Sequence, residues 1–306
     1  MRVFVAGATG AVGRRLVPLL VAEGHDVTGI GRTPEKRAAL ARAGARPVEV
    51  SLFDREALGV AVRGHGVVIN VATHIPSSAG QMMLPRAWKE NDRIRREGAA
   101  NLAAAALAAG AERLVQESFA PIYEDGGERW LDESWPQRPV RHSRSVLDAE
   151  RTVAGFTAQG GTGIVLRFSG FYGDDAFQVR DAVQMIRKGW APMPGAPTAF
   201  FSSIHHDDAA TAVVAALRAP AGTYNVTDDE PLRRREYVDT LAATIGAPPP
   251  KLPPVWLTRL GGSFTELLSR SLRISNRTFR EATGWAPAFP SVRDGWPAVV
   301  RLLRAA

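Results

Sequence analysis

The sequence contains no cysteine and only four lysines, although it has 38 basic residues in all. The absence of cysteine excludes disulfide bonds and a cysteine nucleophile, and it is typical of a reducing compartment. Long apolar runs are also missing: the longest, residues 102–110, is far shorter than the roughly 20 residues that cross a bilayer. The first strand is predicted from about residue 2, which leaves no room for a cleavable signal. We therefore expect a cytoplasmic protein with no membrane partner.

Arginine supplies most of the net charge of +7. A basic balance favours anionic partners, either phosphorylated small molecules or nucleic acid. The arginines are scattered over predicted helix faces, without a basic stripe interleaved with aromatic residues. We therefore expect a small-molecule substrate and no nucleic acid, with a homodimer left open. A chain of 306 residues buries a sufficient core without a structural metal or a disulfide.

The first half of the chain alternates short β-rich runs with longer helical stretches rich in alanine and leucine. This pattern predicts an α/β fold with a doubly wound parallel sheet and right-handed crossovers. Strands are predicted at residues 2–7, 26–32, 46–52, 66–72, 113–118 and 163–169. Helices are predicted between them at residues 12–23, 34–43, 55–62 and 86–109.

The pattern loosens after residue 172, where proline- and glycine-rich segments separate shorter elements. A helix is expected near residues 177–188, a strand and helix within 204–217, and another short strand near 222–228. We assign residues 1–173 and 204–231 to the main domain. Residues 174–203 and 232–306 are assigned to a smaller, discontinuous C-terminal lobe that covers the carboxyl ends of the strands and holds the substrate.

Three glycines, Gly7, Gly10 and Gly13, separate the first predicted strand from the first helix. In this context the first glycine permits a tight turn, the second lets the backbone approach a pyrophosphate, and the third permits close packing of helix and strand. The helix N-terminus adds free N–H groups and a dipole that favours an anion. The motif predicts a dinucleotide cofactor.

The end of the second strand indicates which dinucleotide binds. An acidic residue there would bind the ribose hydroxyls of NAD, but the sequence has Gly31, Arg32 and Thr33, with Arg14 just after the third motif glycine. A guanidinium binds a 2′-phosphate through charge-assisted hydrogen bonds of about 1.5 to 3 kcal/mol each. NADP is therefore the expected cofactor. NAD stays open, because Arg32 can instead cover the adenine or face solvent.

Motifs spread over residues 1–297 resemble those of the extended short-chain dehydrogenase/reductase family, which includes NAD(P)-dependent epimerases and dehydratases. They are GATGAVG at 7–13, Gly98 with Asn101 and Leu102, LRFSGFYG at 166–173, IHHDDAATAVVAAL at 204–217, GTYNVTDDEP at 222–231 and GWAPAFPSVRDGW at 284–296. The resemblance implies that the main domain is a Rossmann-like NAD(P)-binding domain. It also implies cofactor contacts at Gly7, Thr9, Gly10, Ala11, Val12, Gly13, Arg14, Arg32, Ser51, Leu52, Ala72, Thr73, Phe168 and Phe171.

The family's chemistry depends on a Tyr-x-x-x-Lys pair, in which the tyrosine exchanges a proton with the substrate and the lysine lowers the tyrosine pKa. No tyrosine of this chain lies four residues before a lysine. The family places a proline about three residues before the tyrosine and a glutamate eight after it, and Pro139 and Glu150 have this spacing around His142. His142 thus stands in the position of the tyrosine, and Val146 in that of the lysine.

Three residues are candidates for the missing acid-base group. His142 is the first, because imidazole titrates near neutrality; the alternative is a surface histidine at a helix start. Tyr123, just beyond the fifth strand, is either a substitute phenol or a wall of the pocket. Ser118 either donates a hydrogen bond to the substrate or caps a strand end. In the family the serine lies four residues before this tyrosine, whereas Ser118 lies five residues before Tyr123. Phe119 therefore occupies the position of the family serine.

Other departures concern substrate and cofactor. Ser51 replaces the aspartate that usually contacts adenine, and Arg95 replaces an active-site asparagine. Arg95 would suit a carboxylate or phosphate of the substrate, unless it belongs to an exposed helix face. Tyr172 is the second predicted substrate contact. The run of His205, His206, Asp207 and Asp208 suggests metal ligands, but neighbouring positions at a strand end point in opposite directions, so no metal is expected.

The sequence favours an NAD(P)-dependent oxidoreductase or epimerase-like enzyme that acts on a small carbonyl or alcohol, sugar-derived or anionic, with a non-standard acid-base group. A second hypothesis is a dinucleotide-binding regulatory or sensor protein without redox turnover. A third is a non-redox lyase or isomerase in which the nicotinamide only completes the pocket.

Overall fold

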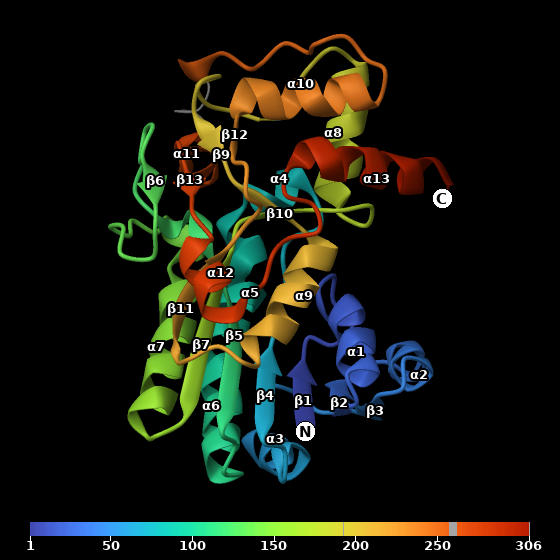
Figure 1. The fold of residues 1–306 in the computed structure, drawn as a ribbon, viewed down its shortest axis with the longest axis vertical. Coiled ribbons are helices and arrows are strands. Elements are labelled where there is room, and N and C mark those ends of the chain that lie inside the picture. Colours follow the sequence, from blue (N-terminus) through green and yellow to red (C-terminus); the bar gives the residue numbers. More distant parts are fainter. Residues whose placement is uncertain (192, 257–261, 306) are drawn as a thin grey trace.

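A central sheet of seven parallel strands organises the computed structural model, which describes residues 1–191, 193–256 and 262–305 (Figure 1). The spatial order is β11 (Gly222–Val226), β7 (Thr162–Phe168), β5 (Arg113–Phe119), β4 (Val67–Asn70), β1 (Arg2–Ala6), β2 (Asp26–Ile30) and β3 (Arg46–Val48). The direction of winding reverses between β1 and β4, and ligands of such sheets bind at that switch point. The predicted doubly wound parallel sheet is confirmed, and β11 adds a seventh strand.

Alternating strand residues pack against helices on opposite faces of the sheet. Val3, Val5 and Ile69 face a core shared with α1 (Gly13–Ala22), α2 (Pro34–Arg42) and α9 (His206–Ala216). Phe4 and Val68 face the second core, which is shared with α3 (Arg55–Val62), α6 (Ala99–Ala108) and α7 (Ser145–Ala158). Because the central strands are buried on both faces, β1 and β4 are largely apolar, whereas β5 carries buried polar residues at 116–118.

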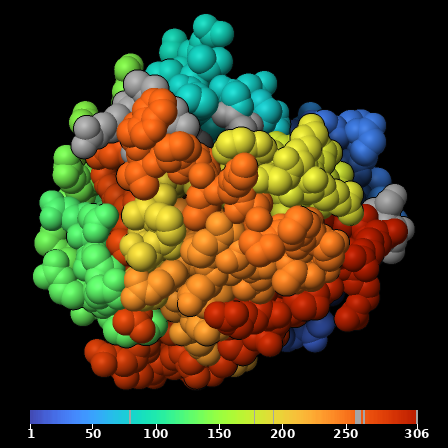
Figure 2. Space-filling view, turned by 90° about the horizontal axis from the view of Figure 1, so that it is seen from above, coloured from blue at the N-terminus to red at the C-terminus, as the bar shows by residue number. Residues whose placement is uncertain are grey.

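A third hydrophobic core lies beyond the carboxyl ends of the strands. It joins α8 (Phe177–Arg187), α10 (Arg234–Thr244) and α13 (Val292–Ala305), which lie together at the top of Figure 1. In Figure 2 the yellow, orange and red side chains of the C-terminal half cover most of this end of the molecule. These helices come from the two segments that the sequence assigned to the smaller lobe. However, Phe279 of α12 (Arg277–Thr283) and the nearby Trp285 pack into the main core.

Three short two-stranded sheets connect the main sheet to this end. They are β8 (Gly170–Tyr172) with β10 (Ser203–His205), β9 (Phe200–Phe201) with β12 (Leu232–Arg233), and β6 (Trp130–Leu131) with β13 (Arg273–Ile274). A further helix, α11 (Gly262–Ser269), precedes β13. Sequence periodicity did not predict most of these strands, because segments of two or three residues have too little periodicity to recognise.

The single helix expected at residues 86–109 is divided in the structure. A short helix, α4 (Ala79–Met82), and a 3₁₀ turn (Pro85–Trp88) precede α5 (Lys89–Arg93), and a π-helical turn (Ile94–Gly98) joins α5 to α6. Isolated π turns within helices occur frequently at functional sites. This one carries the buried Arg95. Within the described ranges, no helix has the length and apolar character needed to cross a membrane.

Candidate active site at the carboxyl ends of the strands

The glycine turn forms the floor of the candidate site. Gly7 follows β1 with φ of 80°, a left-handed conformation that favours glycine, and a Cβ atom there would lie 2.5 Å from Ala72 N. A Cβ atom on Gly13 would overlap the carbonyl oxygen of Gly7. No side chain caps the N-terminus of α1, although its Arg14 and Arg15 N–H groups donate to the carbonyl oxygens of Gly10 and Val12. The dipole at this end of the helix favours an anion. The turn therefore fits the pyrophosphate of a dinucleotide.

The basic residues beside this turn contact acidic residues of a loop that follows β8. Arg14, whose side chain is half exposed, pairs with Asp175, and Arg15 pairs with Asp174 at 3.0 Å and Asp175 at 3.1 Å. Burial tends to raise the pKa of Asp175, but hydrogen bonds from His206 and Arg15 hold it below its usual value. Three ion pairs thus join the glycine turn to the segment leading into α8.

The remaining predicted cofactor contacts lie at the ends of neighbouring strands. Arg32 is exposed just after β2, and Phe168 ends β7 with its ring centroid 5.4 Å from that of Phe171. The other positions follow β1, β3 or β4 in the chain, and they are Thr9, Gly10, Ala11, Val12, Ser51, Leu52, Ala72 and Thr73. Because the strands are parallel, these residues share the carboxyl edge of the sheet.

His142 is buried against Trp88. It lies in a 3₁₀ turn just before α7, is 7% exposed, and its ring centroid is 4.9 Å from that of Trp88. Burial lowers the His142 pKa to about 4; Asp92 opposes this shift and Arg95 adds to it. The imidazole is therefore neutral at pH 7. Val146, in the position of the family lysine, is fully buried.

Tyr123 and Ser118 belong to a different hydrogen-bond network, centred on Arg167. The Tyr123 hydroxyl donates to Asn225 Oδ1 at 2.7 Å and accepts from Arg167 at 2.8 Å, and burial raises the Tyr123 pKa to about 12. Ser118 Oγ donates to Glu150 Oε1 at 2.6 Å. The network joins Ser118 and Tyr123 to Glu150, Arg167 and Asn225.

Tyr172 and Arg95, the predicted substrate contacts, lie in different places. Tyr172 is 1% exposed in the core of the C-terminal helices, with its ring centroid 4.9 Å from that of Trp296. Arg95 is buried near His142 and donates to Glu117 Oε1 at 3.2 Å. Glu117 was not predicted as a site residue. It could have been recognised from the polar run Gln116, Glu117 and Ser118, which lies within a strand expected to be buried.

The histidine and aspartate run at residues 205–208 spreads its side chains in different directions. His206 Nδ1 contacts Asp175 at 2.8 Å, whereas Asp208 accepts the N–H groups of Ala288 and Phe289 at 2.7 and 3.1 Å. In the ranges that the structure describes, no three histidine, aspartate or glutamate side chains are placed to hold a metal ion together.

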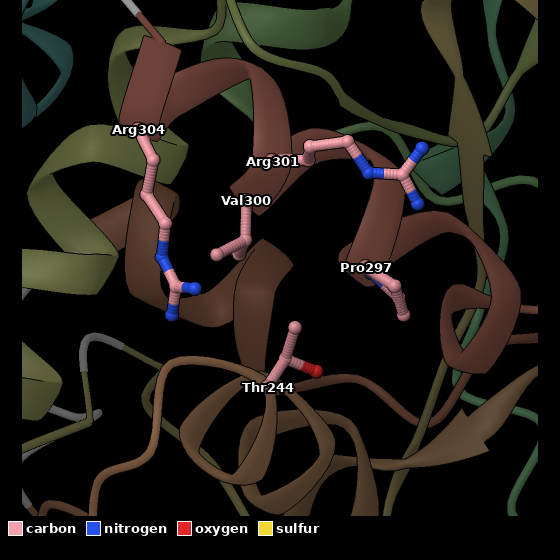
Figure 3. Close-up of a pocket in the computed structure, with 5 residues that line it drawn as sticks. All are labelled: Thr244, Pro297, Val300, Arg301 and Arg304. Atoms are coloured by element: carbon pink, nitrogen blue, oxygen red, sulfur yellow. The ribbon is translucent and has the colours of Figure 1, made fainter.

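Two surface cavities are lined by residues other than those predicted for the site. One, of about 320 Å³, lies between α10 and α13 and is lined by Thr244, Pro297, Val300, Arg301 and Arg304 (Figure 3). The other, of about 430 Å³, borders α7 and includes Glu150 of the Arg167 network. Neither contains a residue of the glycine turn.

Comparisons with known proteins agree with this geometry. A family model described as NAD(P)H-binding matches residues 7–180. A 3-diazoavenalumate denitrifying reductase from Streptomyces sp is 38% identical over 309 residues, which cover 96% of this chain and 99% of that protein. A 4-hydroxy-2-methyl-3-oxo-4-farnesyl-3,4-dihydroquinoline-1-oxide ketoreductase from Stigmatella aurantiaca is 30% identical over 80% of this chain and 74% of its own length.

Solved structures show the same fold at lower identity. A UDP-glucose 4-epimerase from Thermus thermophilus in complex with NAD has a TM-score of 0.79 at 24% identity and covers both chains completely. A human epimerase family protein with NADPH has a TM-score of 0.80 at 22% identity, covering 98% of this chain and 99% of its own.

Proposed function

Because the chain belongs to the NAD(P)H-binding, extended short-chain dehydrogenase/reductase family, we propose that it is an NADPH-dependent reductase that needs no protein proton donor. It is an NAD(P)-dependent enzyme of the oxidoreductase and epimerase type. What we propose in addition is the cofactor form, the reaction and the residues that carry it.

One observation carries this proposal: the position of the family tyrosine holds a neutral base. Reduction of a carbonyl leaves an alkoxide, so an acid must supply a proton as hydride arrives. His142 has its pKa lowered to about 4 by burial and is therefore not protonated at pH 7. Val146 cannot supply the charge of the family lysine. A substrate that takes hydride without a proton suits this site better.

The Streptomyces relative suggests what such a substrate is. Its name describes the reductive loss of nitrogen from a diazo compound. When hydride forms a new C–H bond at a diazonium carbon, the C–N bonding pair leaves with dinitrogen, so atoms, charge and electrons balance without a proton. We propose that this chain catalyses a reaction of the same type on a small aromatic diazonium substrate.

The cofactor binds, in this proposal, at the carboxyl edge of the sheet. The nicotinamide ring, when bound, supplies the hydride. The N-terminus of α1 and the turn at residues 7–13 hold the pyrophosphate, and Arg14 and Arg32 contact the 2′-phosphate of NADP. Arg14 must then exchange its contact with Asp175 for the phosphate. The absence of cysteine and the use of NADPH support a cytoplasmic location.

A second candidate is reduction of a small carbonyl, with His142 as acid-base group and Tyr123 or Ser118 as alternatives. It is supported by the name of the Stigmatella relative, a ketoreductase. Tyr123 is the weaker choice, because Asn225 and Arg167 already engage its hydroxyl. His142 would have to gain a proton from solvent in each turnover.

Purified protein with NADPH tests both candidates. An aryl diazonium salt and an aryl ketone of matched ring size are supplied in parallel, and loss of the nicotinamide absorbance is followed. We expect oxidation with the diazonium salt, and His142→Phe should keep the rate within about threefold. The carbonyl reaction instead predicts oxidation with the ketone and a loss of about 10²- to 10⁴-fold in His142→Phe. No oxidation with either substrate, although NADPH binds, would contradict both.

A further inference from the structure

Arg95 and Glu117 form a buried ion pair at the end of β5. Their side chains are 4% and 8% exposed, and Arg95 donates to Glu117 Oε1 at 3.2 Å. Arg95 lies in the π-helical turn that follows α5, whereas Glu117 lies within β5. The carboxylate offsets the charge of the guanidinium, so Arg95 does not act as a free cation for an anionic substrate group.

Each member of this pair keeps one polar atom without a protein partner. Among the described residues, Arg95 Nε and Glu117 Oε2 are buried and make no hydrogen bond. Asn91, which is 0% exposed, likewise leaves its Nδ2 unused, although its Oδ1 accepts from His74 N at 2.9 Å. Buried polar atoms of native proteins are nearly always hydrogen-bonded, to a ligand or water if not to protein.

The three residues are connected through the chain and through the Arg95–Glu117 ion pair. Asn91 lies in α5, and Arg95 follows four residues later in the π-helical turn. His74, which Asn91 holds, is two residues beyond Ala72, against which Gly7 packs. Arg95 is also close enough to influence the His142 imidazole. These contacts link the residues that carry the unused atoms to the glycine turn on one side and to His142 on the other.

We propose that Asn91, Arg95 and Glu117 form a subsite that binds an uncharged hydroxyl group of the substrate in preference to a carboxylate. This rests on the proposed function only in placing the substrate at this edge of the sheet. A hydroxyl oxygen accepts from Asn91 Nδ2 and Arg95 Nε, and its hydrogen is donated to Glu117 Oε2. A carboxylate has no hydrogen to donate, and its charge is repelled by Glu117.

The subsite is tested by binding of phenol and benzoate, which share one ring and differ in the polar group. Calorimetry is done on the complex with NADP⁺ at about pH 8, where free phenol is neutral and free benzoate is ionised. We expect wild-type protein to bind phenol at least about tenfold more tightly than benzoate. Glu117→Gln should reverse this preference, because Arg95 then carries an uncompensated charge.

Glu97→Gln is the matched control, since Glu97 is an exposed carboxylate of the same helix that pairs with Arg93 at 2.8 Å. It should leave the phenol-to-benzoate ratio unchanged. If Glu117→Gln no longer binds NADP⁺, Asn91→Asp takes its place: it keeps the oxygen that holds His74 N, loses the donor, and should weaken phenol binding about tenfold.

Benzoate binding as tight as that of phenol, no binding of either probe, or an unchanged ratio in Glu117→Gln would overturn the proposal. Failure of the reductase assay would not, because these measurements need no turnover. The two proposals therefore fail separately.

Discussion

The low pKa of His142 predicts a loss of stability in mild acid that a single substitution removes. Burial lowers this pKa from 6.5 to about 4. At about 1.36 kcal/mol for each pH unit, the largest loss in the free energy of unfolding, reached well below pH 4, is about 3 kcal/mol. Between these two pKa values the unfolded chain binds a proton that the native protein does not. The contribution is therefore fully present above about pH 6.5 and is lost as the pH falls toward 4.

His142→Phe keeps an aromatic ring against Trp88 but cannot titrate. The free energy of unfolding of both proteins is measured by urea denaturation at pH 7 and at pH 4.5, with circular dichroism as the signal. Carboxylates titrate equally in both proteins, so their effect cancels in the comparison. From pH 7 to 4.5 the wild type should lose about 2 kcal/mol more than the variant. Equal losses would refute a neutral, buried His142.

Three further variants test the cofactor site and the hydrogen-bond network beside it. Gly13→Val would force a side chain into the Gly7 carbonyl, so NADPH binding measured by calorimetry should disappear. Arg14→Ser with Arg32→Ser should weaken NADPH binding by about ten- to hundredfold while changing NADH binding little, as titration of either dinucleotide will show. Arg167→Met removes the two hydrogen bonds of 2.8 and 2.7 Å that Arg167 donates to Glu150, leaves only that from Ser118, and should lower the free energy of unfolding by about 3 to 5 kcal/mol.

The sequence predicted the parallel sheet and the cofactor turn because both depend on local patterns. Apolar runs bounded by helices specify buried parallel strands, and Gly7 and Gly13 occupy places where any side chain would collide with backbone. Spacing also assigns His142 and Val146 to the positions of the missing pair, and this assignment stays a prediction. These features need only spacing and residue type.

The contacts between side chains required the structure, because sequence spacing does not determine which distant groups meet. Tyr123 was expected at the substrate edge, but its partners Arg167 and Asn225 come from two other strands of the sheet. Glu117 is ordinary in a list of strand residues and becomes notable only when Arg95 is seen 3.2 Å away. The π-helical turn that carries Arg95 interrupts a stretch whose alanine-rich sequence predicts regular helix.

Hydride transfer from NADPH to a carbon that loses dinitrogen is most directly tested with a deuterium label. The protein is supplied with NADPH deuterated at the transferable position and with a hydroxyaryl diazonium substrate, and the product is analysed by mass spectrometry and NMR. We predict one deuterium at the ring carbon that carried nitrogen, in proportion to the NADPH oxidised and the dinitrogen released. A product without deuterium, or one that keeps its nitrogen, would contradict this mechanism.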